Sequence, residues 1–232
     1  MAIFLPGPIV GEIRGSEGGT TFSRNRFGQY TRQRSIPVNP NTGRQASARS
    51  RLAGAAILWS LTLTQVQRDA WDLYATSIIW INALGQPVSL PGFQFFIRMF
   101  TAFLQAGIPA VLDGPTTLAL PSPDSTFAAS ISEATQLISV VFDNTLAWAN
   151  QDDGAMMIHM AQPRGAGRKF IGPPTRFAGA IFGNSTTPPT SPQTIAVPFA
   201  VAVDQNTDVK YRIGEADGRL SGLFLDAVSV AV

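Results

Sequence analysis

His159 is the only histidine of the 232-residue chain, and it is the first residue to test for catalysis. A histidine base needs a nucleophile or an acid held beside its imidazole. No serine or acid stands near His159 in a recognisable nucleophile pattern, and alternation along residues 156–160 places the ring on the solvent side of a strand. We predict no catalytic residue and no enzyme; a triad assembled in space from distant residues is the alternative that the sequence leaves open.

Two short motifs contain groups that hold metals or phosphates in other proteins. Asp152-Asp153-Gly154 lacks the alternating ligands and the closing glutamate of a calcium loop, so we expect a hairpin turn with a positive backbone angle. Gly165-Ala166-Gly167-Arg168-Lys169 lacks the final Gly-Lys-Ser/Thr of a phosphate loop, so we expect a flexible connection between strands. The chain has no cysteine, which excludes thiolate metal sites. We predict no metal and no cofactor.

Arginine is concentrated at the start of the chain. Residues 1–60 contain eight arginines, no lysine and two glutamates, whereas residues 61–115 carry a net charge of −1 and residues 116–232 a net charge of −3. Arginine suits bidentate contact with carboxylates and phosphates. Because the first segment is basic and the rest is mildly acidic, the first segment of one copy is suited to dock on the body of another.

The arginines alternate with other residues along 21–36, which places one set of side chains on one face of an extended strand. We predict that this set makes the contacts of the arm: Phe22, Arg24, Arg26, Tyr30, Arg32 and Arg34. Three interpretations stay open, of which we favour contact with a neighbouring protein subunit. The others are nucleic acid, with arginines on phosphates and aromatic rings on bases, and a solvated tail.

Short strands are expected in this arm, which covers residues 1–41. Glycines separate candidate strands at Ile9–Arg14, Thr20–Arg24 and Gln29–Arg34, and the prolines of Pro37–Asn41 end them. A ribbon of two or three such polar strands is marginally stable by itself and needs something to pack on.

Residues 42–112 read as three helices. Asn41 or Thr42 can cap the first, over residues 42–61; Thr64 and Gln67 are spaced as a capping box for the second. The third helix follows Gly92, and Gly107 and Pro109 end it. It carries an apolar stripe, which we interpret as a core face; a stripe that lines a ligand groove is the alternative. The stripe is Phe93, Phe96, Ile97, Phe100, Phe103 and Leu104.

Residues 113–232 lose the helical period and show short alternating runs instead. Their spacing is typical of a β-sandwich of immunoglobulin type. The expected strands are Thr126–Ile131, Gln136–Phe142, Met156–Ala161, Arg176–Phe182, Thr194–Ala202, Val209–Glu215 and Leu223–Val232. The fold class predicted for the whole chain is therefore a multidomain α+β protein: an extended arm, a small helical middle and a C-terminal all-β sandwich.

Several strings carry a resemblance that spans about residues 10–107. They are Gly15-Ser16, Gly18–Arg26, Tyr30 with Arg32, Pro37–Thr42, Leu63-Thr64, Gln67-Arg68, Ala70-Trp71, Tyr74-Ala75, Gly92-Phe93 and Phe96–Arg98. With them, this region resembles a group of uncharacterised proteins from phage and prophage-like regions. The resemblance implies a virion-type structural protein and no catalytic residues. Through Tyr211-Arg212-Ile213 and Ala216–Ser221, the C-terminal region is similar to fibronectin type III modules.

Composition agrees with an assembly role. Charged residues make up only 14% of the chain, which indicates a surface that other subunits cover. No run approaches the ~20 apolar residues of a membrane helix, so no membrane partner is expected. We predict a structural component of a tailed-bacteriophage-like virion, made in the host cytoplasm, whose partners are copies of itself and other virion proteins. The alternatives are a nucleic-acid-binding protein and a carbohydrate-binding or adhesive sandwich protein.

Overall fold

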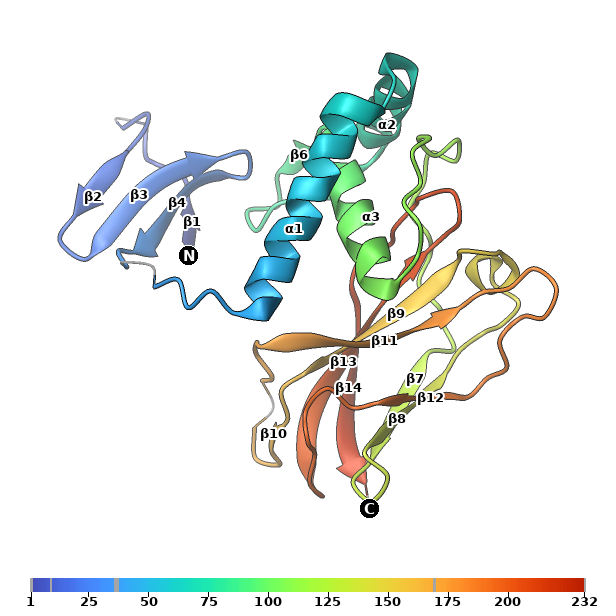
Figure 1. Ribbon diagram of the computed structural model, residues 1–232. Coiled ribbons are helices and arrows are strands. Elements are labelled where there is room, and N and C mark those ends of the chain that lie inside the picture. Colours follow the sequence, from blue (N-terminus) through green and yellow to red (C-terminus); the bar gives the residue numbers. More distant parts are fainter. Residues whose placement is uncertain (1, 9, 36–37, 169, 232) are drawn as a thin grey trace.

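The computed structural model describes residues 2–8, 10–35, 38–168 and 170–231. In chain order these residues form a small N-terminal sheet, a group of helices and a larger C-terminal sheet (Figure 1). The chain is therefore a mixed protein of the α+β class, as predicted. None of the described helices combines the length and the hydropathy that crossing a bilayer requires.

The N-terminal sheet is antiparallel, with strand order β1-β4-β3-β2. The strands predicted at Thr20–Arg24 and Gln29–Arg34 are confirmed. The strand predicted at Ile9–Arg14 is wrong: residues 10–14 form a loop, and Ile9 lies outside the described residues. The observed strands are β1 (Ala2–Phe4), β2 (Gly15–Glu17), β3 (Thr20–Asn25) and β4 (Gly28–Gln33).

The helices begin and end at the signals that the sequence carries. Thr42 and Thr64 each form a complete capping box, with Gln45 and Gln67, which satisfies free amides of the first turn. Gly107 ends the third helix in the left-handed conformation, φ 86°. The helices are α1 (Gly43–Ile57), which continues into the π-helical turn η1 (Leu58–Thr62), α2 (Gln65–Ser77) and α3 (Gly92–Ala106).

A short hairpin that the sequence analysis did not predict stands between α2 and α3. It consists of β5 (Ile79–Ile81) and β6 (Pro87–Ser89). The side chain of Asn82 closes the turn by accepting hydrogen bonds from the amides of Leu84 and Gln86, both at 2.9 Å.

The apolar stripe of α3 is largely a core face. Phe96, Phe100 and Phe103 are buried, whereas Leu104 is 49% exposed. The same core includes Ala155 and Met157 of the C-terminal sheet. Helices and sheet thus share one hydrophobic cluster. The division at residue 112 stays a prediction, and this shared cluster is a reason to expect the two regions to unfold together.

The C-terminal strands follow the predicted segments closely. β12 is shorter than its predicted range Thr194–Ala202 because Pro198 cannot donate to a strand ladder; Val232 lies outside the described residues. The strands are β7 (Ala128–Ser132), β8 (Leu137–Val141), β9 (Ala155–Ala161), β10 (Arg164–Gly165), β11 (Thr175–Phe182), β12 (Gln193–Ala196), β13 (Gln205–Gly214) and β14 (Phe224–Ala231). A 3-10 turn, η2 (Ala147–Asn150), precedes β9.

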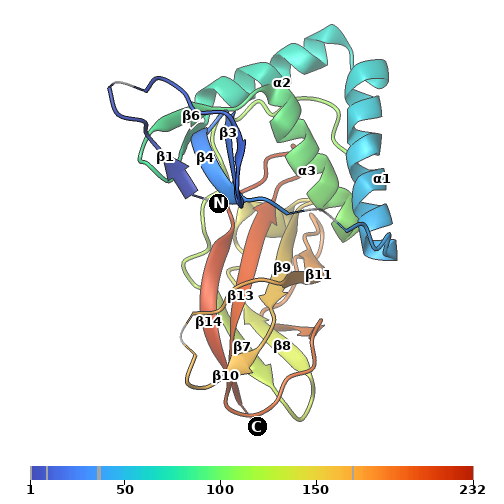
Figure 2. The ribbon, with the colours of Figure 1, turned by 90° about the vertical axis from the view of Figure 1, so that its left-hand side faces the viewer.

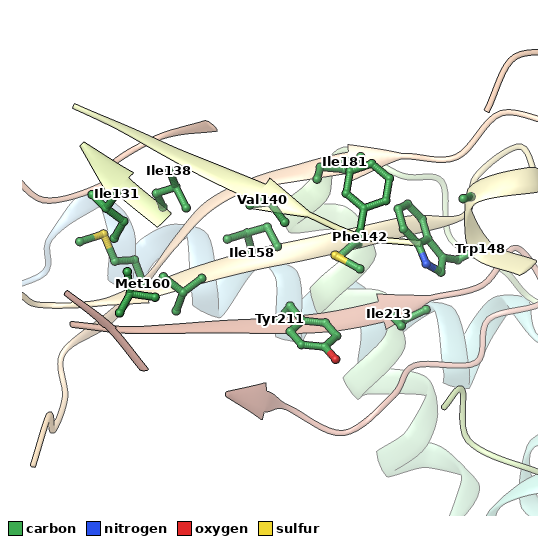
Figure 3. Close-up of a cluster of buried hydrophobic side chains, with 14 of the residues drawn as sticks. Ile131, Ile138, Val140, Phe142, Trp148, Ile158, Met160, Ile181, Tyr211 and Ile213 are labelled. Atoms are coloured by element: carbon green, nitrogen blue, oxygen red, sulfur yellow. The ribbon is translucent and has the colours of Figure 1, made fainter. Parts of the chain in front are cut away.

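These strands are joined in the order β11-β9-β13-β14-β7-β8-β12, with β10 beside β13. β14 runs antiparallel to β13 and parallel to β7. Strands far apart in this order meet in one buried cluster: Ile138 and Val140 of β8 lie across from Ile158 and Met160 of β9 (Figure 3). The ladder therefore folds over on itself, and its two halves enclose a core.

Candidate subunit interface

A two-residue turn joins β3 to β4, and it decides where the predicted contact residues point. Asn25 pairs with Gly28, so Arg26 and Phe27 form the turn. The Asn25 side chain accepts a hydrogen bond from the Phe27 amide at 2.9 Å, and Gly28 has φ +117°, which favours glycine. This local chemistry makes the hairpin.

The register of the hairpin divides the predicted contact residues between two faces. Residues directly opposite each other lie on the same face, and Phe22 pairs with Thr31 while Ser23 pairs with Tyr30. Phe22 and Arg24 therefore lie on one face, and Tyr30 and Arg32 on the other. The prediction that all of them share a face is wrong. A two-residue turn places even-numbered residues of β3 and even-numbered residues of β4 on opposite faces.

The face with Phe22 and Arg24 is partly covered by the chain itself. Gln29 holds the loop before β2 on this face: its amide nitrogen donates to the Gly11 carbonyl at 3.0 Å, and its oxygen accepts from the Ile13 amide at 3.3 Å. In the same loop, Glu12 pairs with Arg24 at 4.0 Å. The ring of Phe22 contacts that of Phe4, with 6.3 Å between centroids. No local pattern of the sequence predicts that this loop lies across the hairpin.

The opposite face carries Tyr30 and Arg32, and no loop of the described residues is hydrogen-bonded across it as the loop before β2 is across the first face. Tyr30 is half-buried and Arg32 is exposed. Arg34 follows the end of β4: its amide donates to the Gly19 carbonyl at 2.8 Å, and the residue as a whole is exposed. No described residue forms an ion pair with Arg32 or Arg34. Both guanidinium groups are thus available to a carboxylate or phosphate from outside the chain.

The tip of the hairpin contacts the body of the protein. Arg26 donates to the Ser89 carbonyl at 3.3 Å, and the Asn82 side chain donates to the Phe27 carbonyl at 3.0 Å. Both partners belong to the β5–β6 hairpin and its turn, and Figure 2 shows the N-terminal sheet beside β6. Arg26 is therefore used within the chain, so the six predicted residues separate into a pair beside the loop before β2 (Phe22 and Arg24), a group on or beside the other face (Tyr30, Arg32 and Arg34) and the tip (Arg26).

The residues singled out for catalysis lie elsewhere and in unexpected surroundings. His159 does not face solvent: its face of β9 is turned towards the helices, and its ring lies 5.4 Å from that of Phe177. Burial, and secondarily the charge of Arg212, lowers the pKa of His159 to about 4. The sequence could not predict this cover because alternation within one strand says nothing of what packs on it.

The Asp152–Gly154 turn has a structural role that its hydrogen bonds explain. It links η2 to β9 and is therefore not a hairpin turn, although Asp153 has the expected positive angle, φ 63°. Asp152 accepts hydrogen bonds from the Ser185 amide and hydroxyl, at 3.0 and 2.8 Å, which lower its pKa. Among the described residues, no three histidine, aspartate or glutamate side chains gather as metal ligands.

The glycine-rich run after β9 connects strands, as predicted. Arg164 and Gly165 form β10, and the amide of Arg168 closes a turn on the Gly165 carbonyl at 3.0 Å. Lys169 lies outside the described residues. Comparison with known proteins adds no template for any of these sites: no protein-family model, no curated protein and no solved structure matches the chain.

Proposed function

We propose that this protein is a structural component of a tailed-bacteriophage-like virion and that it assembles with its neighbours through the N-terminal sheet. One observation carries the proposal: this sheet has no hydrophobic core. Within the described part of residues 2–35 the one buried residue is Gln29, which is polar. Small sheets are stable when an apolar face is packed against something, so we assign the missing cover to a neighbouring subunit.

Tyr30, Arg32 and Arg34 are the residues that we expect to meet that neighbour. They stand on or beside the face that the chain leaves open, and the two arginines have no ion-pair partner among the described residues. The net charge of −3 on residues 116–232 offers carboxylates on another copy.

Exposed apolar side chains on the helices support the same proposal. Leu61 of η1 is 81% exposed and Val66 of α2 is 78% exposed, close together in sequence at the corner between α1 and α2. Exposed apolar side chains at such a corner suit contact with another protein.

We also infer that residues 113–232 form a sandwich of the immunoglobulin or fibronectin type III kind. The strand order supports it: β7, β8 and β12 make one layer and β11, β9, β13 and β14 the other, with a shared core. Tyr211 of β13 fixes the segment before β7 to the other layer, because its hydroxyl donates to the Asp124 carbonyl at 3.1 Å and accepts from the Asp124 amide at 3.0 Å.

Paired substitutions on the two faces of the N-terminal sheet test the proposal. We expect Tyr30→Ala with Arg32→Ala to weaken self-association at least tenfold, measured by sedimentation velocity across a concentration series. The control is Arg14→Ala, which removes an exposed arginine that pairs with Glu12 on the covered side at 2.7 Å. Equal association of the double variant and the wild-type protein would overturn the proposal.

Nucleic acid is the second candidate partner, because the same unpaired Arg32 and Arg34 suit phosphates. Fluorescence anisotropy with a labelled duplex separates the two: phosphate contacts give an affinity that falls steeply with salt. Absence of binding at low salt excludes this candidate. The carbohydrate-binding alternative has no comparable support, since Trp148, the tryptophan of the C-terminal region, is only 1% exposed.

A further inference from the structure

A groove runs between α1 and the helix-facing side of the C-terminal sheet, away from the N-terminal sheet. Its inner end is a cavity of about 270 Å³ against β9 and β13, and its outer end is a hollow of about 680 Å³ beside β11. Arg51, Gln105 and Phe177 line both parts, which makes them one continuous feature.

The charge of this groove is one-sided. Arg51 and Arg212 line the inner cavity, Arg44 and Arg176 line the outer hollow, and no aspartate or glutamate lines either part. None of the four arginines forms an ion pair within the described ranges. Of these four arginines, only Arg176 donates a hydrogen bond to a described residue, the carbonyl of Pro198 at 3.1 Å. Like charges gathered without a counter-charge repel one another, and a bound anion relieves that repulsion.

Two nitrogen atoms at the inner end are buried without a partner. Nε of Arg212 and Nδ1 of His159 are shielded from solvent, and neither makes a hydrogen bond of good geometry with a described residue, although the backbone of Met157 lies close enough to the His159 ring to favour its protonated form. Strand register explains why they are neighbours: Arg212 pairs with Met157, two residues before His159 on the same face of β9. A buried polar atom without a good partner lowers the stability of the folded chain, so two such atoms side by side call for an explanation.

We propose that this groove binds an oxyanion, a carboxylate or phosphate group, at its inner end. Arg212 and Arg51 supply the charge-assisted hydrogen bonds, and His159, protonated on Nδ1, donates a further one. Ala48, Ala102 and Phe177 line the same cavity and accept a small carbon portion of the ligand. The site is independent of the proposed assembly surface, because none of its residues belongs to the N-terminal sheet.

The imidazole of His159 is a built-in reporter for the test, since it is the only one in the chain. Inorganic phosphate and succinate are titrated separately, at constant pH and ionic strength, while the ring signals of His159 are followed by NMR. The proposal predicts a saturable shift with at least one of the two anions. A saturable shift with phosphate alone would show that the groove takes a phosphate group. A saturable shift with succinate alone would show that it takes a carboxylate group. No saturable shift with either anion, up to about 10 mM, overturns the proposal.

Substitutions locate the binding. We expect Arg212→Gln and Arg51→Gln each to weaken the anion at least tenfold in the same titration, whereas Arg49→Gln leaves it unchanged. Arg49 is the matched control because it lies on the same helix but does not line the groove, its guanidinium being bonded to Asn39 and Asn41. Unchanged affinity in both groove variants contradicts the proposal. If a groove variant fails to fold, the titration of the wild-type protein still decides it.

Discussion

β3 of the N-terminal sheet and β9 of the C-terminal sheet have similar lengths, six and seven residues, yet they differ in what covers them. β9 is buried on both faces, by the facing half of the sheet and by the helices, and six of its seven residues are buried. β3 has no buried residue. The difference follows from residue type: β9 reads Ala-Met-Met-Ile-His-Met-Ala, whereas β3 reads Thr-Thr-Phe-Ser-Arg-Asn. The strand with the apolar side chains is thus the one that the rest of the chain buries.

This contrast separates the part of the chain that supplies most of the stability from the part to which we assign assembly. The helices and the C-terminal sheet contain both hydrophobic clusters, so they account for most of the free energy of folding. The N-terminal sheet is held by its own hydrogen bonds and by two bonds from its tip to the body. Substitutions in the two regions should therefore have very different effects on unfolding.

The largest effect is expected at the junction of helices and sheet. Phe103 is fully buried, and its ring packs against Gly214 of β13. Phe103→Ala should lower the free energy of unfolding by about 3–5 kcal/mol, because it leaves a cavity that the sheet cannot fill. Urea unfolding followed by circular dichroism and tryptophan fluorescence measures this. The two signals should change together; loss of helix at a lower urea concentration than loss of sheet would show that the two regions fold separately.

A smaller loss is expected where a single charged side chain joins the two regions. Arg98 of α3 donates to the carbonyls of Leu220 and Ser221 and lies over the Trp80 ring, 5.1 Å from its centroid. Arg98→Leu should cost about 2–3 kcal/mol of unfolding free energy, since it leaves two carbonyls without their donor. Arg68→Leu, at a half-buried position of α2 where the side chain donates to one carbonyl, is the control. Equal costs for both would mean that Arg98 does not join the regions.

The pH dependence of unfolding gives a further test of the cover over β9. The unfolded chain binds a proton on histidine near pH 6.5, but the folded protein does so only near pH 4. Acidification from pH 7 to pH 5 therefore favours the unfolded chain, by about 1–2 kcal/mol. His159→Gln should remove this part of the loss, measured by urea unfolding in a cationic amine buffer that does not fill the groove. If the unfolding free energy of the variant changes with pH as steeply as that of the wild-type protein, the pKa of His159 is not lowered by burial and the ring is not covered.

The smallest effect is expected in the N-terminal sheet. Phe22→Ala removes the ring contact with Phe4 and leaves both buried clusters untouched. The unfolding free energy of the body should fall by less than about 1 kcal/mol. A loss as large as that of Phe103→Ala would erase the distinction between the two regions.

Local signals made the helices and the C-terminal strands predictable. Thr64 and Gln67 satisfy amides within one turn, and Val209 to Ile213 alternate within one strand, so neither needs knowledge of distant residues. The faces of the N-terminal hairpin were not predictable in the same way. They depend on the number of residues in the turn at Arg26 and Phe27. A turn longer or shorter by one residue would move every side chain of β4 to the opposite face of the hairpin relative to β3.

The groove and the surroundings of His159 depend on tertiary packing. Arg51 and Arg212 are 161 positions apart, and only the packing of α1 on α3 and of α3 on β13 brings them to one cavity. The arginine-rich start of the sequence indicated a basic surface, but it did not reveal that Glu12 and Gln29 cover one side of it while the other stays open.

Removal of the N-terminal sheet tests the central claim most directly. Residues 42–232 and the full chain are compared by circular dichroism, for folding, and by mass photometry and electron microscopy, for assembly. The account predicts that residues 42–232 keep the cooperative unfolding of the body but stay monomeric, whereas the full chain forms larger assemblies. Assemblies of the same size from the truncated protein would contradict it.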